Sequence, residues 1–221
     1  MSGVDAEAVL ASLGASDIVL VFGGTFDPPH HGHLDLPEAA RQALGAAYVA
    51  YLPAGRSPFK QGIEQSPPGV RLRLLRTALE GRPNALVLPW EVDAGDGAPT
   101  YTIDSIERLA KLTRARLRLL IGVDQAASFA RWRSSDRLMA LAEPAVMARS
   151  SAEVATRAWL RGLPEAQRAA WAPRLVQTPE LHVSSTEIRR RVAMGQSIDG
   201  LCPPGVARRI EELGLYRPSS A

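Results

Sequence analysis

IVLVFGGTFDPPHHGH, residues 18–33, is the segment that decides the fold of this chain. Its first five residues are apolar and rich in β-branched side chains, which is typical of a strand buried in a parallel sheet. Gly23 and Gly24 follow directly, and glycine lets the backbone turn sharply and approach a ligand closely. A helix is expected to begin near Gly32, where its free N–H groups would form an anion site. The segment therefore predicts a strand, a turn and a helix N-terminus that receive a phosphate group.

Three of the four histidines in the chain, His30, His31 and His33, lie in this segment. His30 and His33 are three residues apart, so both can lie on one face of the first helical turn. Three interpretations compete: metal binding, a structural turn with incidental histidines, and phosphate binding. No acidic cluster follows at helical spacing, so we predict no protein-bound metal. Phosphate binding accounts best for three histidines placed directly after a strand.

Further apolar runs alternate with segments of helical spacing. The expected strands are residues 48–52, 85–88, 117–121 and 145–148. The expected helices are residues 37–44, 70–79, 103–111 and 135–141. Such alternation predicts a parallel sheet covered by helices on both faces, and ligands bind these sheets beyond the carboxyl ends of the strands. Residues 150–175 are predicted to form a helical excursion, and residues 184–216 two more helices.

A second candidate phosphate site is VSSTEIR, residues 183–189. Two serines and a threonine precede a helical pattern, where hydroxyl groups and free amides can cap the helix or bind an anion. Arg189 would lie in the first turns of that helix, able to bind two phosphate oxygens at once. Taken alone, a capping box formed by Ser184 and Glu187, followed by a basic helix face, explains the segment equally well. Arg190 and Arg191 are expected to face solvent or acidic neighbours.

The composition is that of a soluble globular protein, with 221 residues, 46% of them hydrophobic and 22% charged. The net charge of +3 is too small to indicate nucleic-acid binding by itself. No apolar run is long enough for a membrane span or a signal sequence. Cys202 is the only cysteine, so the chain can form neither an internal disulfide nor a multi-cysteine metal site. These features favour a cytoplasmic enzyme.

Residues 24–33 resemble the signature of the nucleotidyltransferase superfamily, whose members transfer AMP or CMP from a nucleoside triphosphate, and residues 183–189 resemble its ISSTxIR element. The resemblance implies that His30 and His33 touch the triphosphate, with His31 as a spacer, and that Arg189 holds phosphate. His30, His33 and Arg189 are therefore the expected catalytic residues.

Other segments are similar to the bacterial nicotinate-nucleotide adenylyltransferases, and the likeness covers roughly residues 17–217. The similar segments are residues 53–60, 100–106, 121–124, 129–132 and 214–216. Together with the two signatures, the likeness implies the following ATP-binding residues: Gly23, Gly24, Thr25, Phe26, His30, His33, Gly122, Asp124, Ser184, Ser185, Thr186 and Arg189.

The implied acceptor site consists of Lys60, Thr102 and Trp132. The flat face of Trp132 would stack on the pyridine ring, Thr102 and nearby amides would hold the carboxylate, and Lys60 would meet the phosphate. Each residue also has a structural interpretation: a packing tryptophan, a helix N-cap and a solvated surface lysine. Two positions depart from the family pattern. Phe59 replaces a histidine, and Pro37 lies where alanine is common, so the helix after His33 is expected to start later or to bend.

The resemblance implies a Rossmann-like, doubly wound, mostly parallel α/β sheet with a small C-terminal helical subdomain. We expect a single domain, residues 1–221, divided into a core at 17–183 and a helical part at 184–217. The implied reaction joins ATP and nicotinate mononucleotide to give deamido-NAD and pyrophosphate, with Mg²⁺ accompanying ATP and no tightly bound cofactor. Neither nucleic acid nor membrane is an expected partner, and a homo-oligomer is possible.

Three alternatives stay open from the sequence. One is an adenylyltransferase for another phosphorylated acceptor, such as nicotinamide mononucleotide or phosphopantetheine. The second is a nucleotide-binding regulatory protein without turnover, although His30, His33 and Arg189 are all retained. The third is a basic RNA-binding module, which the modest charge does not favour.

Overall fold

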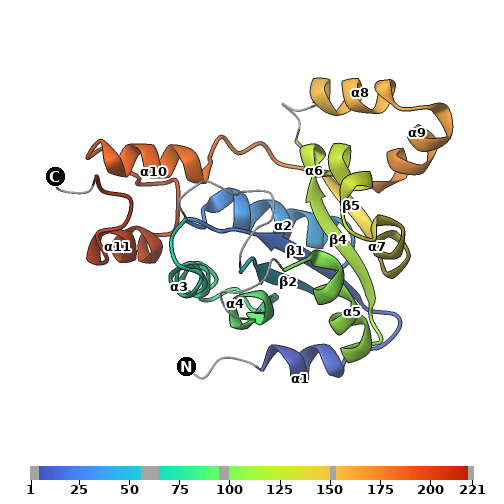
Figure 1. The fold of residues 1–221 in the computed structure, drawn as a ribbon, viewed down its shortest axis with the longest axis horizontal. Coiled ribbons are helices and arrows are strands. Elements are labelled where there is room, and N and C mark those ends of the chain that lie inside the picture. The colour runs from blue at the N-terminus through green and yellow to red at the C-terminus, as the bar shows by residue number, and fades with distance from the viewer. Residues whose placement is uncertain (1–4, 56–64, 95–99, 150–152, 219–221) are drawn as a thin grey trace.

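The computed structural model describes residues 5–55, 65–94, 100–149 and 153–218. In these ranges six parallel strands form one sheet in the order β3-β2-β1-β4-β5-β6 (Figure 1). Their bounds are β1 Ile18–Gly24, β2 Tyr48–Pro53, β3 Ala85–Val87, β4 Arg116–Gly122, β5 Ala142–Arg149 and β6 Leu175–Thr178. The strand order reverses between β1 and β4, where such sheets bind ligands. The predicted doubly wound α/β fold is confirmed, with every strand pairing parallel.

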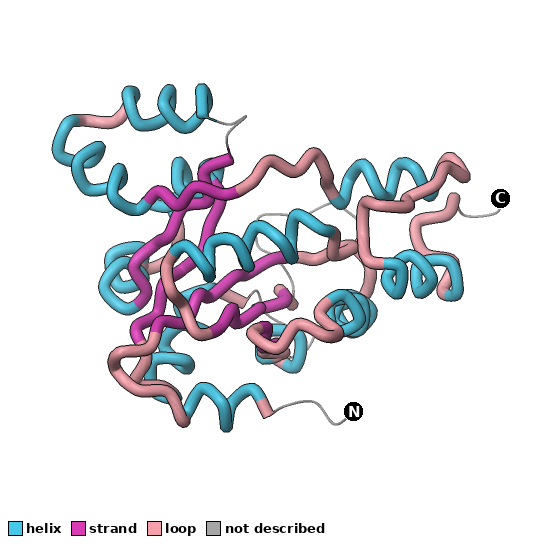
Figure 2. Tube along the Cα trace, turned by 180° about the vertical axis from the view of Figure 1, so that it is seen from behind, coloured by secondary structure: helices cyan, strands magenta, loops and turns pink. Residues whose placement is uncertain are grey.

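Helices connect the strands and complete the chain. The α-helices are α1 Ala6–Ala11, α2 His31–Ala43, α3 Pro68–Ala78, α4 Trp90–Asp93, α5 Thr102–Leu112, α6 Val123–Ser128, α7 Ser135–Leu141, α8 Glu153–Gly162, α9 Glu165–Trp171, α10 Ser185–Ala193 and α11 Pro204–Glu212. Short 3-10 helices lie at Phe129–Arg131 and Ala172–Arg174. The α8–α9 and α10–α11 pairs lie at opposite ends of the molecule (Figure 2).

The central strand β1 is buried on both faces, as its apolar run predicts. Val19, Leu20 and Val21 have 0% exposure. Val19 and Val21 pack in a core cluster with residues of α1, α5 and α7, whereas Leu20 packs in a second cluster with residues of α2, α3 and α11. Alternate side chains of one strand thus enter two separate cores, so the β1 backbone is fixed between two helical layers.

Several elements were not predicted from the pattern, among them strand β6 and the short helices α1, α4 and α6. Strand β6 has only four residues, of which Val176 and Thr178 are buried. Four residues that directly follow two helices carry too little periodicity to be distinguished from a helix end. Helix α1 is also short, and the Asp5 carboxylate caps it by accepting hydrogen bonds from the amides of Glu7 and Ala8.

Helix α2 corrects the expectation of a later start, because it begins at His31 and runs through Pro37. Proline has no N–H, so Pro37 cannot donate to the carbonyl of His33 one turn earlier. The buried side chains of Leu34, Leu36 and Ala40 hold this helix against the sheet on both sides of the proline. Tertiary packing therefore outweighs the local helix-breaking preference.

The C-terminal helices pack on the same core as the helices that follow β1 and β2. Ile188 of α10 and Val206 and Ile210 of α11 are buried in the cluster that contains Leu34 of α2. The division of the chain at residues 183 and 184 stays a prediction. None of the helices in the described ranges has the length and apolar content needed to cross a bilayer.

Candidate active site

The carboxyl end of β1 forms the centre of the candidate site. Gly24 ends the strand, and a Cβ at this position would lie 2.8 Å from the ring of Phe26, which is 1% exposed. Phe26 itself has a φ of 52°, in the left-handed region that side chains other than glycine seldom adopt. The buried Phe26 ring thus fixes a tight turn directly after the strand, and the Asp27–Pro28 peptide bond that follows is cis.

His30 and His33 are brought together at the start of α2. Their rings stack with centroids 3.7 Å apart and planes at 24°. A Cβ on Gly32 would lie 3.0 Å from the ring of His30 and 3.3 Å from Val183, so the residue between the histidines must be small. His31 instead lies 3.4 Å from Asp35, which agrees with its predicted role as a spacer.

The N-terminus of α2 is less open to an anion than the sequence predicts. The His31 amide donates a hydrogen bond to the carbonyl of Leu201 at 3.1 Å, and the His33 amide donates to the carbonyl of His30 at 2.8 Å. Two of the four amides that a helix start normally leaves free therefore have partners within the protein. An anion at this position would rely more on the two imidazole rings than on the amides.

The second motif meets the first one across the sheet edge. Ser185 at the start of α10 donates a hydrogen bond to the carbonyl of Pro28 at 2.8 Å. Arg189 donates from Nη1 to the carbonyl of Asp27 at 2.7 Å, and its Nη2 lies 3.5 Å from the hydroxyl of Thr186. The structure therefore brings together the residues that the two signatures identified.

Only one half of the predicted capping box forms in α10. Ser184 is the N-cap, and its hydroxyl oxygen accepts a hydrogen bond from the Glu187 amide at 3.2 Å. The Glu187 carboxylate binds Arg190 and Arg191 instead of turning back to Ser184. Hydrogen bonds from these two arginines lower the pKa of Glu187 to about 2. As expected, Arg190 and Arg191 lie against an acidic neighbour, which leaves Arg189 as the arginine that faces the site.

The sequence allows Asp27 either to organise the site through its carboxylate or to cap a helix, and in the structure that carboxylate links three distant parts of the chain. Its carboxylate accepts a hydrogen bond from the Tyr216 hydroxyl at 2.6 Å and another from the Ser66 amide at 3.1 Å. Burial, followed by the contact with Asp27, raises the pKa of the Tyr216 phenol, so this hydroxyl stays a donor. Asp27 does not cap α2, whose N-cap is His30. The Gly-Leu-Tyr ending was the one available signal for Tyr216.

Two of the implied acceptor residues, Thr102 and Trp132, lie on the face of the sheet covered by α5 and α7. Thr102 is the first residue of α5 and Tyr101 is its N-cap, so the N-cap interpretation of Thr102 is wrong. The guanidinium of Arg133 lies 4.5 Å from the ring centroid of Tyr101. Because Arg133 follows Trp132, this contact brings the start of α5 close to the predicted stacking tryptophan.

Trp132 is half-buried and belongs to an aromatic cluster. Its ring lies 5.5 Å from Phe129, Phe129 lies 5.6 Å from Trp171, and Trp171 lies 5.5 Å from Trp159. Trp159 and Trp171 pack against the core, as predicted, and Trp90 is buried as well. The α8–α9 segment thus supports Trp132 from behind through Phe129.

The remaining predicted positions lie at the end of β4 or outside the described ranges. Gly122 ends β4, and its amide donates a hydrogen bond to the Gln125 side chain at 3.0 Å. Asp124 is exposed in the first turn of α6, next to that strand end. Lys60 lies outside the described residues. Within the ranges that the structure describes, no group of three or more histidine, cysteine or acidic side chains could hold a metal ion.

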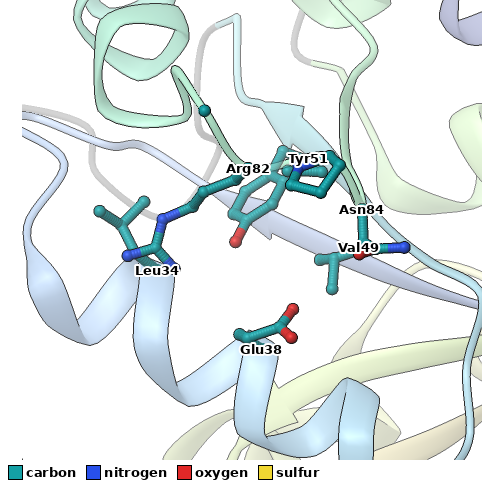
Figure 3. A pocket seen from close by; sticks show the side chains of 9 residues that line it. Leu34, Glu38, Val49, Tyr51, Arg82 and Asn84 are labelled. Atoms are coloured by element: carbon teal, nitrogen blue, oxygen red, sulfur yellow. The ribbon is translucent and has the colours of Figure 1, made fainter.

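A pocket of about 220 Å³ lies between α2, β2 and the segment that leads into β3 (Figure 3). The Tyr51 hydroxyl points into it between Arg82 and Glu38. Arg82 forms a 2.7 Å ion pair with Asp35, and Glu38 forms one of 2.8 Å with Arg41. None of the predicted site residues lines this pocket, so it is distinct from the candidate site.

Fold and site together define a nucleotidyltransferase with a parallel α/β sheet. The model of the cytidylyltransferase-like family matches residues 21–191, which include both signatures. The chain belongs to this family and, within it, to the nicotinate-nucleotide adenylyltransferases.

Curated relatives carry this assignment, and a solved structure shares the fold. A probable nicotinate-nucleotide adenylyltransferase of Roseiflexus sp. (strain RS-1) is 36% identical over 200 residues, 89% of this chain and 96% of the relative. One from Bordetella petrii is 37% identical over 199 residues, 89% of this chain and 97% of the relative. The Plasmodium falciparum nicotinic acid mononucleotide adenylyltransferase, solved with NaAD, shares the fold with a TM-score of 0.67 at 13% identity, over 90% of this chain and 97% of that one.

Replacing Tyr216 with phenylalanine is expected to destabilise the protein, because the buried Asp27 carboxylate loses its shortest hydrogen bond. A hydrogen bond to a charged group contributes about 1.5–3 kcal/mol, and urea unfolding would measure the loss. Tyr48→Phe is the matched control, since Tyr48 is half-buried at the opposite end of β2. Equal stabilities for Tyr216→Phe and Tyr48→Phe would contradict the importance of the Asp27 contact.

Proposed function

We propose that this protein transfers AMP from ATP to nicotinate mononucleotide, giving deamido-NAD and pyrophosphate. The observation that carries the proposal is the meeting of the two phosphate signatures, where Arg189 contacts the Asp27 carbonyl three residues before the His30–His33 pair. Membership of the nicotinate-nucleotide adenylyltransferase family supports the acceptor. The proposal includes a cytoplasmic location and no nucleic-acid partner, and it leaves assembly into a homo-oligomer open.

On the donor side, the proposed ATP site follows the carboxyl edge of the sheet. It comprises Gly23, Gly24, Thr25, Phe26, His30, His33, Gly122, Asp124, Ser184, Ser185, Thr186 and Arg189. The acceptor phosphate is itself the nucleophile, and its second pKa near 6 means that it needs no strong base at pH 7. The protein would therefore act by aligning the two substrates and by stabilising the charge on the α-phosphate.

ATP is proposed to enter as its Mg²⁺ complex, so the cation is part of the substrate. Mg²⁺ takes most of its ligands from phosphate oxygens and water and needs few from the protein. In this proposal His30, His33 and Arg189 hold the phosphates, and the cation offsets the charge on the leaving pyrophosphate.

On the acceptor side, Trp132 would stack on the pyridine ring, Thr102 and nearby amides would hold the carboxylate, and Lys60 would meet the phosphate. The aromatic cluster behind Trp132 keeps its ring in one orientation, which suits a stacking surface. A site built for a carboxylate discriminates against the amide, whose NH₂ group cannot accept the same hydrogen bonds.

The acid and amide substrates separate this function from its rivals. Purified protein with MgATP is expected to release pyrophosphate with nicotinate mononucleotide, at a kcat/KM at least about tenfold higher than with nicotinamide mononucleotide. Detection of deamido-NAD by mass spectrometry confirms the product. Preference for the amide would indicate the nicotinamide alternative, and no turnover with either would favour the regulatory protein.

Replacing His33 with alanine is expected to lower kcat by roughly a hundredfold or more, because a contact to the transition-state charge is lost. Steady-state pyrophosphate release measures this effect, with the thermal midpoint recorded for the same samples. His182→Ala provides a matched control, since His182 is an exposed histidine paired with Glu180. A kcat for His33→Ala within threefold of the unmodified protein would refute the assigned role.

Replacing Trp132 with alanine is expected to raise the KM for nicotinate mononucleotide by about tenfold, because a stacking surface worth roughly 1.5 kcal/mol is removed. The KM for ATP should change by less than twofold. Trp159→Ala tests the packing contribution, since Trp159 belongs to the same cluster and is separated from Trp132 by the rings of Phe129 and Trp171. A parallel rise in both KM values would contradict the stacking assignment.

A further inference from the structure

Arg71 of α3 is a buried cation whose hydrogen-bond partners are backbone carbonyls. Its side chain is 1% exposed. Nη1 donates to the carbonyl of Thr25 at 2.8 Å, Nη2 to that of Gly55 at 2.7 Å, and Nε to that of Ser66 at 3.0 Å. One rigid guanidinium therefore ties the turn after β1 to the two chain segments that follow β2 and precede α3.

This arrangement is unusual for a buried charge, which normally has a carboxylate in direct contact. The negative charge of Asp27 acts on Arg71, and the Asp27 carboxylate binds the amide of Ser66 while the carbonyl of Ser66 binds Arg71. The pKa of Arg71 is lowered by burial and raised by Asp27. The cost of burying this cation is offset because three carbonyl groups from separate segments find donors in one plane.

A second contact continues from Gly55 towards the acceptor side. A Cβ on Gly55 would lie 2.1 Å from the carbonyl oxygen of Glu91, so Gly55 packs directly against α4. Helices α3 and α4 lie side by side next to the end of β2 (Figure 1). The position of Gly55, which Arg71 holds, therefore determines how close α4 lies to the end of β2.

Glu91 connects α4 to the start of α5 through hydrogen bonds. Its partly buried carboxylate accepts hydrogen bonds from the hydroxyls of Thr100 and Ser105, each at 3.0 Å. Burial raises the pKa of Glu91, and the two hydroxyl donors lower it. Thr100 and Ser105 lie on either side of Thr102, the residue proposed to hold the acceptor carboxylate. Glu91 thereby fixes the backbone on both sides of that residue.

We infer that Arg71 and Glu91 are positioning residues. Together they fix the distance between the turn at Thr25, on the donor side, and the start of α5 at Thr102, on the acceptor side. The inference rests on the proposed function, because it assigns the donor to one turn and the acceptor to the other. In-line transfer needs the two phosphates aligned within a fraction of an ångström, and a 1 Å misplacement costs roughly a hundredfold in rate. A continuous set of contacts between the two turns supplies that alignment.

The test uses Arg71→Lys, which retains the charge but cannot reach three carbonyls at once. We expect kcat to fall by about tenfold or more, with the Kd for ATP, measured without acceptor, changed by less than threefold. Arg41→Lys is the matched control, because Arg41 also donates to a backbone carbonyl, that of Ala46, at the far end of α2. Its kcat should stay within twofold of the unmodified protein.

Glu91→Gln is a second, independent test, which applies even if Arg71→Lys folds poorly. We expect the KM for nicotinate mononucleotide to rise by about fivefold or more, with the KM for ATP unchanged, because one hydroxyl beside the acceptor turn loses its acceptor. In the double variant the fold loss in kcat/KM for nicotinate mononucleotide should be less than the product of the two single fold losses, since both residues act on one set of contacts.

Two results overturn the inference. The first is an Arg71→Lys or Glu91→Gln protein that is folded at the assay temperature and has kcat and KM within twofold of the unmodified protein. The second is a loss of rate that matches the loss of folded protein, which a purely structural role would give. If the unmodified protein is active, either result leaves the proposed function standing. An unmodified protein without turnover would overturn both proposals.

Discussion

The carbonyl oxygens of Asp27 and Pro28 accept hydrogen bonds from residues 162 and 157 positions later in the chain, Arg189 and Ser185. Closing so long a loop has a large entropic cost, which two hydrogen bonds cannot offset alone. The cost is met by apolar packing, since Ile188 lies between these two residues and is completely buried in the same core as Leu34. Helix α10 is thus anchored by its apolar side, which leaves its polar side facing the end of β1.

This anchoring leaves the Arg189 guanidinium oriented before any substrate enters. A guanidinium has five N–H donors, and the contacts with Asp27 and Thr186 use two of its nitrogen atoms. The Asp27 carbonyl is a neutral acceptor, whereas a phosphate oxygen is charged and forms the stronger hydrogen bond. Exchange of the carbonyl for a phosphate, or sharing between them, therefore needs little rearrangement. The stacked His30 and His33 rings are held in the same way by the small Gly32 and by Val183.

The sequence predicts the parts of this site that depend on local order, and misses those that depend on burial. The run at residues 18–22 and the alternation after it predicted the sheet, because a buried parallel strand must be apolar on both faces. Strand β6 was missed because four residues carry no usable period. Arg71 could not be recognised from the sequence. Lys60 and Lys111 are the only lysines among the 26 basic residues, so the chain has many arginines, and nothing in the sequence distinguishes a buried arginine from an exposed one. The contact between Tyr216 and Asp27 spans 189 positions and follows only from the closed fold.

The α8–α9 segment, which matched no motif in the sequence, packs its tryptophans behind the proposed acceptor side. Trp171 meets Phe129 edge to face at 77°, and Phe129 lies against Trp132 at 35°. A ring with one face open to a ligand needs packing on its other side, because an unsupported side chain would lose rotamer entropy on binding. Phe129 provides that packing, and Trp171 of α9 packs in turn against Phe129. Substitutions in α8 and α9 are therefore expected to alter how the proposed acceptor is held without touching it.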